Sequence, residues 1–412
     1  MERHKADIEL DVEESTQGGT HILETPARLD TELDTGHEID PAITPVEGGP
    51  AEAIATTSLS YNQLVARRFR RNPYGMTGLI ICILIILIAI FPGFLAPYGP
   101  RTANSSAIYS PPQLIRMTGE GGLVRPHVLG VTEEMDMNTF EITFIPDPEQ
   151  RVDLSFFVKG EEWHFFGLTF DRHLIGSTNG QPFHLLGTDG LGRDIFSRMI
   201  YGTRITLLMG FLVMLAAGII GTILGVSSGY FGGVYDLIVQ RMVEFTKSFP
   251  DLPLYLVLVS LLPRRADATL IFIMFAGILV LLGWADVSRE LRGKVMSMRN
   301  LEYVRAAEAV GAGSGRILFN HLLPNVSSHI IVWATYALPN YILLESFLSF
   351  LGVGVQAPMV SWGSMLNQVL DFQSFAAAPW MMSPVAMIIL SVLAFNAFGD
   401  GLRDAMDPYS NV

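Results

Sequence analysis

The chain has 412 residues, of which 50% are hydrophobic and 16% are charged, whereas a soluble domain carries about 25% charged residues. This composition excludes an ordinary soluble globule and indicates a membrane protein. Most of the net charge of −13 comes from residues 1–52, which hold 14 acidic and 3 basic side chains. The rest is nearly neutral, so we expect no nucleic-acid partner. The single cysteine, Cys82, excludes an internal disulfide framework and a multi-cysteine metal site.

Residues 1–58 are rich in Glu, Asp, Thr, Gly and Pro and show little apolar periodicity. Such a segment cannot bury enough apolar surface to offset its chain entropy, so we expect a disordered acidic tail. It lacks the basic start and apolar core of a signal peptide. The prediction is a solvated cytoplasmic tail, and a docking or regulatory role is the alternative.

Residues 59–100 combine a basic flank with the first predicted transmembrane span. Arg67, Arg68, Arg70 and Arg71 precede an apolar run over 76–97, which is long enough to cross a hydrocarbon core of ~30 Å at ~1.5 Å per residue. Arginines beside a first span hold that flank in the cytoplasm. The amino terminus is therefore predicted to lie inside.

Residues 101–186 are polar and mixed, and they predict a small β-rich insertion outside the membrane. Three pieces are typical of strands, with a break at Pro146-Asp147-Pro148: Phe140–Ile145, Val152–Lys159 and Trp163–Phe170. A long, partly buried loop is the alternative.

Residues 187–412 return to apolar runs and predict a five-helix core. With the first span, the predicted crossings number six and cover 76–97, 205–228, 240–262, 269–286, 327–347 and 381–399. Starting inside, six crossings also end inside. The 287–325 loop then lies in the cytoplasm, and its six arginines and lysines agree with the positive-inside tendency.

The 287–325 loop is long for a connector and contains a predicted helical hairpin over 302–324. Glu302–Val310 is rich in helix formers, Gly311–Gly315 breaks the helix, and a second stretch runs from Arg316 to Pro324. Small Ala306 and Ala307 allow another surface to approach closely. We expect a docking platform beneath the membrane; a self-packed amphipathic hairpin is the alternative.

The hairpin resembles the EAA loop, which marks the permease subunits of binding-protein-dependent ABC importers. The matching residues are Arg305-Ala306-Ala307, then Gly311 after three residues, then His321-Leu322-Leu323-Pro324 after nine. Arg305 stands where the family has Glu, and His321 stands where it has Ile. The Ala, Gly and Pro scaffold is kept.

Two further stretches resemble the dipeptide, oligopeptide and nickel permease group. One runs from Gly187-Thr188-Asp189 through Gly192-Arg193-Asp194 to Ser197-Arg198. The other runs from Glu345 to Gly354 and is followed by Ser361-Trp362-Gly363. The resemblance covers about 60–100 and 184–408. It implies an all-α polytopic membrane protein of the type I ABC importer permease kind, with six transmembrane helices.

The 187–204 segment predicts a turn into an amphipathic helix at the outer face, capped by Thr188 or Asp189. Ile195, Phe196, Met199 and Ile200 would form its apolar side, so Arg193, Asp194 and Arg198 would face water or headgroups. This outer-face motif, Asp189, Gly192, Arg193, Asp194 and Arg198, could receive a binding protein. A structural interface anchor is the alternative.

The third predicted span is unusually charged. Arg241–Glu244, Glu244–Lys247 and Lys247–Asp251 can pair on one helix face. Ionisable groups at membrane depth normally face a bundle interior or an aqueous path, while Pro250 and Pro253 kink or break the helix. We expect Glu244, Lys247, Asp251 and, in the fifth span, Glu345 to line the pathway. The alternatives are an interfacial or partner contact and, for Glu345, a helix-packing role.

The sequence contains no Gly-x-x-x-x-Gly-Lys-[Ser/Thr] phosphate loop, no Gly-x-Ser-x-Gly elbow and no His-Glu-x-x-His motif. The nine histidines show no metal-ligand spacing. We therefore expect a transport subunit without ATPase activity, with no catalytic or metal site and no cofactor of its own.

The resemblance implies an importer permease in a prokaryotic cell (inner) membrane, with both termini cytoplasmic. Its expected partners are a second permease, two ATPases that hydrolyse ATP, an extracytoplasmic substrate-binding protein and lipid. The expected hairpin contacts to the ATPase are Arg305, Ala306, Ala307, Gly311, Leu323 and Pro324. The expected cargo is peptide. A nickel or other small-solute permease, an autonomous secondary transporter and a scaffolding sensor are the alternatives.

Overall fold

The computed structural model describes residues 60–119, 122–135, 142–165, 167–263, 265–371, 375–376 and 378–407. The predicted acidic tail, 1–58, lies outside the described residues. The unit Leu59–Val412 holds the helices and a four-stranded sheet. Five helical segments in the described part are long and apolar enough to cross a membrane: Pro73–Ile90, Ile195–Phe231, Ala268–Met298, Ser314–Phe350 and Pro379–Met406.

The chain enters the bundle through α1 (Tyr61–Arg71), α2 (Pro73–Ile90) and the short α3 (Pro92–Leu95). Asn72 ends α1 and caps α2, since its side-chain oxygen accepts a hydrogen bond from the Gly75 N–H at 3.0 Å. A Cβ atom at Gly75 would lie 2.8 Å from Gly401 Cα. The glycine therefore lets α2 pack directly on α13 (Ser383–Met406).

The most extensive packing between two helices of the bundle joins α4 (Ile195–Phe231) to α7 (Ala268–Met298). Gly221, Gly225 and Gly229 recur every four residues and therefore line one face of α4. A Cβ atom at Gly225 would lie 2.4 Å from the Ser288 carbonyl oxygen, and one at Gly229 would lie 2.9 Å from the Arg292 carbonyl oxygen. Small residues at this spacing let two membrane helices approach through their backbones.

The predicted third span, 240–262, is not one helix. The structure forms α5 (Gly233–Lys247) and α6 (Asp251–Ser260), which are separate and short. Pro250 lies between them as the N-cap of α6, and it has no N–H to continue the ladder of α5. The predicted break at Pro250 is therefore present, while the prediction of a single continuous span is wrong.

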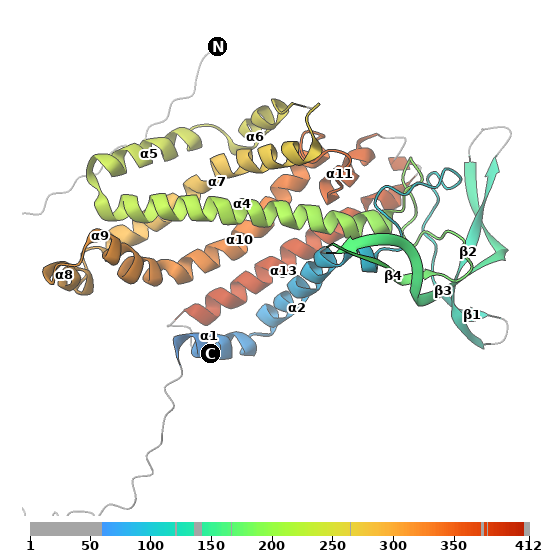
Figure 1. The fold of residues 1–412 in the computed structure, drawn as a ribbon, viewed down its shortest axis with the longest axis horizontal. Helices are drawn as coiled ribbons and strands as arrows, with labels where there is room; N and C mark the ends of the chain where they lie inside the picture. The colour runs from blue at the N-terminus through green and yellow to red at the C-terminus, as the bar shows by residue number, and fades with distance from the viewer. Residues whose placement is uncertain are drawn as a thin grey trace, which may run out of the picture. The chain divides into compact units, whose positions relative to one another are not determined.

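The remaining helices complete the bundle. They are α8 (Glu302–Ala309), α9 (Ser314–Arg316), the π-helix η1 (Ile317–Leu322), α10 (Leu323–Phe350), α11 (Trp362–Asn367) and the 3-10 turns η2 (Gln368–Leu370) and η3 (Pro379–Met382). Buried side chains of α4, α7 and α10, such as Met209, Phe275 and Leu348, form the main core. Figure 1 shows α4, α7, α10, α13 and α2 running lengthwise beside one another.

The insertion contains an antiparallel sheet in the order β1 (Arg116–Gly119), β2 (Gly122–Met135), β3 (Ile142–Phe165) and β4 (Leu168–Ser177). The predicted β-rich character is confirmed, but the strand bounds are wrong. Phe140 lies outside the described residues. The sheet lies at the end of the bundle where α2 ends and α4 begins (Figure 1).

Two strand predictions differ from the structure for identifiable reasons. The predicted break at Pro146-Asp147-Pro148 lies inside β3, where the pairing register jumps from Leu129–Arg151 to Gly130–Asp147. The prolines therefore mark a bulge, because a bulge tolerates residues that cannot donate to the ladder. The predicted strand Trp163–Phe170 instead spans the turn between β3 and β4, and β1 and β2 were not predicted.

Candidate functional site

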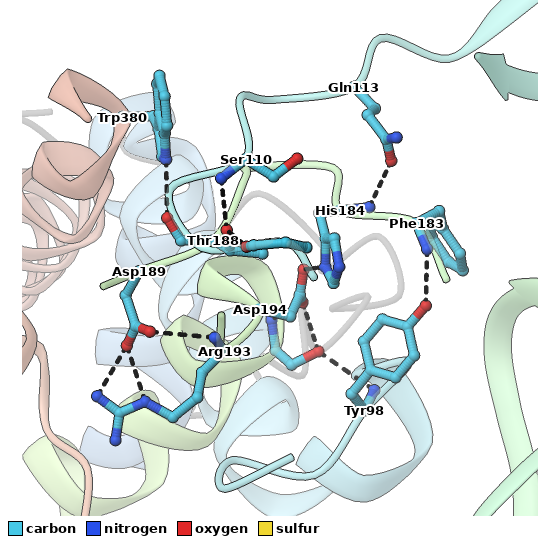
Figure 2. Close-up of polar contacts among 12 residues, drawn as sticks. Tyr98, Ser110, Gln113, Phe183, His184, Thr188, Asp189, Arg193, Asp194 and Trp380 are labelled. Carbon is cyan, nitrogen blue, oxygen red and sulfur yellow. Dashed lines mark hydrogen bonds and ion pairs between the residues drawn. The ribbon is translucent and has the colours of Figure 1, made fainter. Parts of the chain in front are cut away.

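The outer-face motif starts α4, and its cap is Asp194 rather than the predicted Thr188 or Asp189. The Asp194 carboxylate accepts hydrogen bonds from the Ser197 N–H at 2.7 Å and the Ser197 hydroxyl at 2.6 Å. His184 Nδ1 lies 3.0 Å from the other Asp194 oxygen (Figure 2). Asp194 therefore fixes the first turn of α4 and also holds the preceding loop.

Asp189 organises the turn before this helix. Its carboxylate accepts the backbone N–H groups of Leu191 at 2.9 Å and Arg193 at 3.0 Å, and it pairs with the Arg193 guanidinium at 2.8 Å. Arg198 Nε lies 3.7 Å from the same carboxylate. Gly192 has φ +70°, and a Cβ atom there would lie 1.9 Å from the Asn104 carbonyl oxygen, so only glycine fits.

The expectation that Asp194 and Arg198 face water or headgroups is wrong, because both are buried within the chain. Asp189 is also buried, with 2% of its surface exposed, and Arg193 is half-buried. A charged group leaves water only when partners replace its hydration, and the turn supplies them. The motif residues are therefore committed to one another and to their own backbone.

The motif also ties together segments that are distant in the sequence (Figure 2). Thr188 accepts a hydrogen bond from the Ser110 N–H at 2.8 Å, and the Thr188 carbonyl accepts the Trp380 indole N–H at 3.1 Å. The Tyr98 hydroxyl accepts the Phe183 N–H at 2.9 Å, and burial raises the pKa of Tyr98. The loop after α3, the start of α4 and the start of α13 thus form one connected end of the bundle.

A cleft of about 1180 Å³ opens beside α5, α6, α7, α10 and α13. Lys247 lies on its wall, with Nζ 2.7 Å from Asp286 and 3.2 Å from Asp251. His329 Nε2 lies 3.2 Å from a Glu290 oxygen on the same wall. The lining also contains Tyr255, Trp333, Tyr336, Asn340, Tyr341, Lys294 and Arg403. The cleft therefore offers charges of both signs among aromatic side chains.

The structure separates the four residues that were expected to line a pathway. Lys247 and Asp251 line the cleft. Glu244 does not; it pairs with Arg241 at 2.7 Å on an exposed part of α5, and no pair with Lys247 forms. Glu345 also lies outside the lining, is 0% exposed and accepts a hydrogen bond from Ser349 at 2.7 Å, a placement that favours the helix-packing alternative.

Sequence reasoning missed the acidic wall of the cleft. Asp286, Glu290 and Lys294 recur every four residues on α7, so they share one face of that helix. This ladder lies where the predicted fourth span meets the basic loop, and its spacing could have identified it. Among the described residues, no three His, Cys, Asp or Glu side chains gather to hold a metal ion.

The predicted hairpin over 302–324 forms at the opposite end of the bundle from the sheet (Figure 1). Helix α8 ends in a Schellman motif: the Ala312 N–H bonds to the Ala307 carbonyl at 3.0 Å and the Gly311 N–H bonds to the Glu308 carbonyl at 2.9 Å. Gly311 has φ +83°. No atom lies within 4 Å of a Cβ built there, so its conformation, rather than lack of space, requires glycine.

The hairpin divides into a packed side and an exposed side. Val304 and Ala307 are buried against Ile317, Leu322 and Val326. Ala307 therefore serves the chain's own core, while Arg305, Ala306, Gly311 and Pro324 are exposed and Leu323 is half-buried. Val310 is 85% exposed and Phe319 is 69% exposed. The exposed side thus carries large apolar groups that the described part of the chain leaves uncovered.

Two protein families match the chain. Residues 221–410 match the family described as "Binding-protein-dependent transport system inner membrane component". Residues 60–112 match the "N-terminal TM domain of oligopeptide transport permease C". These ranges contain the hairpin, the cleft wall and the first span, whereas the β-sheet lies between them.

Relatives with curated names match between about half and most of the chain. The dipeptide transport system permease protein DppC of Haemophilus influenzae is 33% identical over 342 residues, which are 82% of this chain and 92% of that protein. The oligopeptide transport system permease protein OppC of Bacillus subtilis is 32% identical over 361 residues, 87% of this chain and 93% of that protein. DppC of Alkalihalophilus pseudofirmus is 42% identical over 226 residues, 55% of this chain and 72% of that protein.

Proposed function

Because the chain belongs to the family of binding-protein-dependent transport system inner membrane components, we propose that it is the permease subunit through which an ABC importer carries peptides. Relatives named as dipeptide and oligopeptide permeases support the peptide class. ATP is hydrolysed by partner ATPase subunits. The remaining partners are a second permease and an extracytoplasmic substrate-binding protein.

In this proposal the chain crosses the inner membrane six times, with α5 and α6 together making the third crossing. Five candidate spans would place the two termini on opposite sides, whereas a sixth crossing returns both to the cytoplasm. The arginines of α1 and the basic 287–325 loop support this orientation, because basic residues concentrate on the cytoplasmic side. The sheet then faces the extracytoplasmic space.

The exposed side of the hairpin is the proposed contact to an ATPase. Arg305, Ala306, Gly311 and Pro324 carry it, together with exposed Val310 and Phe319. Exposed apolar groups beside a packed core are typical of a protein interface. Val304 of the first arm shares a buried cluster with Leu291 and Val295 of α7, and the second arm continues into α10, so movement of the platform would reach the cleft. This arrangement is the single observation that supports a permease coupled to ATPase subunits over an autonomous transporter.

The cleft is the proposed wall of the pathway, closed by the second permease. A peptide carries a positive amino end and a negative carboxyl end. Lys247 lies on one wall with Asp286 and Glu290, so both ends find an opposite charge. Tyr255, Trp333 and Tyr341 offer apolar surface for varied side chains.

We propose that the sheet contacts the binding protein directly and that the outer-face motif supports this contact without touching the binding protein. Asp189, Gly192, Arg193, Asp194 and Arg198 hold the end of the bundle together, so we propose that they shape a docking platform rather than touch the partner. The sheet extends beyond that platform and is the proposed direct contact. Unchanged docking after deletion of residues 116–177 would overturn this assignment.

Reconstitution tests the function. The chain is purified with its partner permease, ATPases and binding protein in proteoliposomes, and uptake of a labelled dipeptide, a labelled pentapeptide and Ni²⁺ is compared with and without ATP. We expect ATP-dependent peptide uptake. Uptake of Ni²⁺ but neither peptide would replace the peptide assignment with the metal alternative, and uptake by the chain alone without ATP would replace the importer with an autonomous transporter.

A further inference from the structure

The tip of the β3–β4 hairpin, defined as Trp163–Phe165 and Leu168–Phe170, has one aromatic face. Trp163 is paired directly with Phe170, and Phe165 is paired with Leu168. Directly paired residues share a face of an antiparallel ladder, and the next residues along point to the other face. The other face carries His164 and Thr169, whose side chains lie 3.1 Å apart. The tip is therefore amphipathic.

The aromatic face packs on the end of the first span. The rings of Phe165 and Phe91 have centroids 5.1 Å apart, and a Cβ atom at Gly93 would lie 2.6 Å from the Trp163 ring. Phe157, in the adjoining part of β3, lies 5.9 Å from Phe94. These contacts fix the tip beside α3, directly after the last residue of the apolar helix α2.

The aromatic face extends beyond what α3 can cover, because α3 has only four residues. Trp163 stacks on Phe170 at 4.9 Å, but Phe170 remains exposed, and Leu168 is 64% exposed. Phe157, which lies by Phe94 of α3, is also exposed. A contiguous group of large apolar side chains on a surface indicates an interaction site.

This group continues the lipid-facing surface of α2. Ile80, Ile83, Leu84, Leu87 and Ile90 are exposed along α2, which is a candidate membrane span with most of its surface uncovered by the chain. Aromatic residues are enriched where a span meets the headgroup layer. The tip lies at that level, because Phe165 and Trp163 contact Phe91 and Gly93, which directly follow α2.

We propose that the tip of the β3–β4 hairpin is a membrane-interface anchor. It inserts Leu168, Phe170 and Phe157 into the boundary between headgroups and acyl chains, in the leaflet at the α3 end of the first span. The polar face with His164 and Thr169 points away from the acyl chains. The anchor holds the base of the sheet against the bilayer and so limits how far the sheet can tilt.

Site-directed fluorescence tests the anchor. The complete transporter is assembled with Cys82→Ser, which removes the single cysteine, and with Leu168→Cys carrying an environment-sensitive nitrobenzoxadiazole label. Asn179→Cys is the matched control, since it is exposed at the other end of β4. Each labelled complex is placed in phosphatidylcholine–phosphatidylglycerol vesicles that contain either headgroup-level nitroxide lipid or no quencher, and iodide is added from the water.

We expect nitroxide lipid to quench the label at position 168 at least threefold more than the label at 179, and iodide to show the reverse order. Equal iodide quenching at the two positions would overturn the anchor, because the tip would lie in water. Protection of position 168 from both quenchers would also overturn it, because a protein partner would then cover the tip. Phe170→Cys repeats the measurement if the label at 168 prevents assembly of the complex.

Discussion

Arg292 of α7 holds Asp236 of α5 in a two-point ion pair, with Nε to Oδ1 and Nη2 to Oδ2 both at 2.6 Å. Ser228 of α4 donates to the same carboxylate. Three helices therefore meet at one carboxylate. Both side chains are mostly buried, so water could not fully hydrate either charge if its partner were removed.

We predict that Arg292→Ala lowers the free energy of unfolding by about 1–3 kcal/mol, because Asp236 would keep a mostly buried charge without its main partner. Thermal unfolding of the purified complex in detergent measures this. The control is Arg241→Ala, which removes an exposed pair with Glu244 on the same helix and should cost less than about 1 kcal/mol. Equal effects of the two substitutions would contradict the prediction.

We predict that Gly192→Ala is far more harmful than Gly180→Ala, although both glycines have φ +70°. A Cβ at 192 would strike the Asn104 carbonyl, whereas nothing lies within 4 Å at 180. Gly180→Ala should lower the free energy of unfolding by about 1–2 kcal/mol through backbone strain alone. Gly192→Ala should lower it by about 1–3 kcal/mol more, because it adds the steric clash. The comparison is made by unfolding in detergent; equal losses would remove the steric argument.

We predict that Gly311→Ala reduces binding-protein-stimulated ATPase activity, while Gly313→Ala leaves it within twofold of the parent complex. Both positions have free space, but only Gly311 needs a positive φ. Gly311→Asn should retain more activity than Gly311→Ala, because Asn adopts this conformation more readily. The stimulated rate is measured in proteoliposomes, with co-purification of the ATPases recorded. A Gly311→Ala complex with full coupling would show that the Schellman turn is dispensable.

We predict that Lys247→Met lowers peptide uptake by about tenfold, which corresponds to roughly 1.4 kcal/mol. The substitution removes the only partner that the described residues show for Asp251 and the closest for Asp286. Arg241→Met is the control, since Arg241 is exposed and outside the cleft lining. Uptake of a labelled dipeptide is measured at fixed ATP. Equal uptake by the two variants would remove Lys247 from the pathway.

Much of the helical architecture was predictable because long charge-free runs have few alternatives to a membrane span. The third crossing was harder to define, because the predicted break at Pro250 divides it into the two short helices α5 and α6. The upstream end of that crossing was also hidden, since α5 carries charges that pair with other helices. Hydropathy alone cannot anticipate such pairs.

The outer-face motif shows a second limit. Its residues were recognised, but Asp194 and Arg198 were placed in water because charged residues are usually exposed. Their burial depends on segments that are distant in the sequence. Arg198 donates a hydrogen bond to the carbonyl of Pro100 at 3.4 Å, and Thr188 of the same turn is bonded to Ser110 and Trp380. In contrast, the glycine that ends α8 was predictable from the local sequence, because a Schellman turn is built from neighbouring residues.

The second arm of the hairpin continues into the following span without a non-helical break, through α9, η1 and α10. The segment Ser314–Phe350 is helical throughout its 37 residues, so it is a rod of about 55 Å. If the whole helix rotates by about 10° about its hairpin end and stays straight, its far end moves by roughly 10 Å. Tyr336, Asn340 and Phe347 belong to this helix and line the cleft. Their displacement therefore increases with their distance from the hairpin. The helix can bend at Pro339, and a bend there would reduce the displacement of its far end.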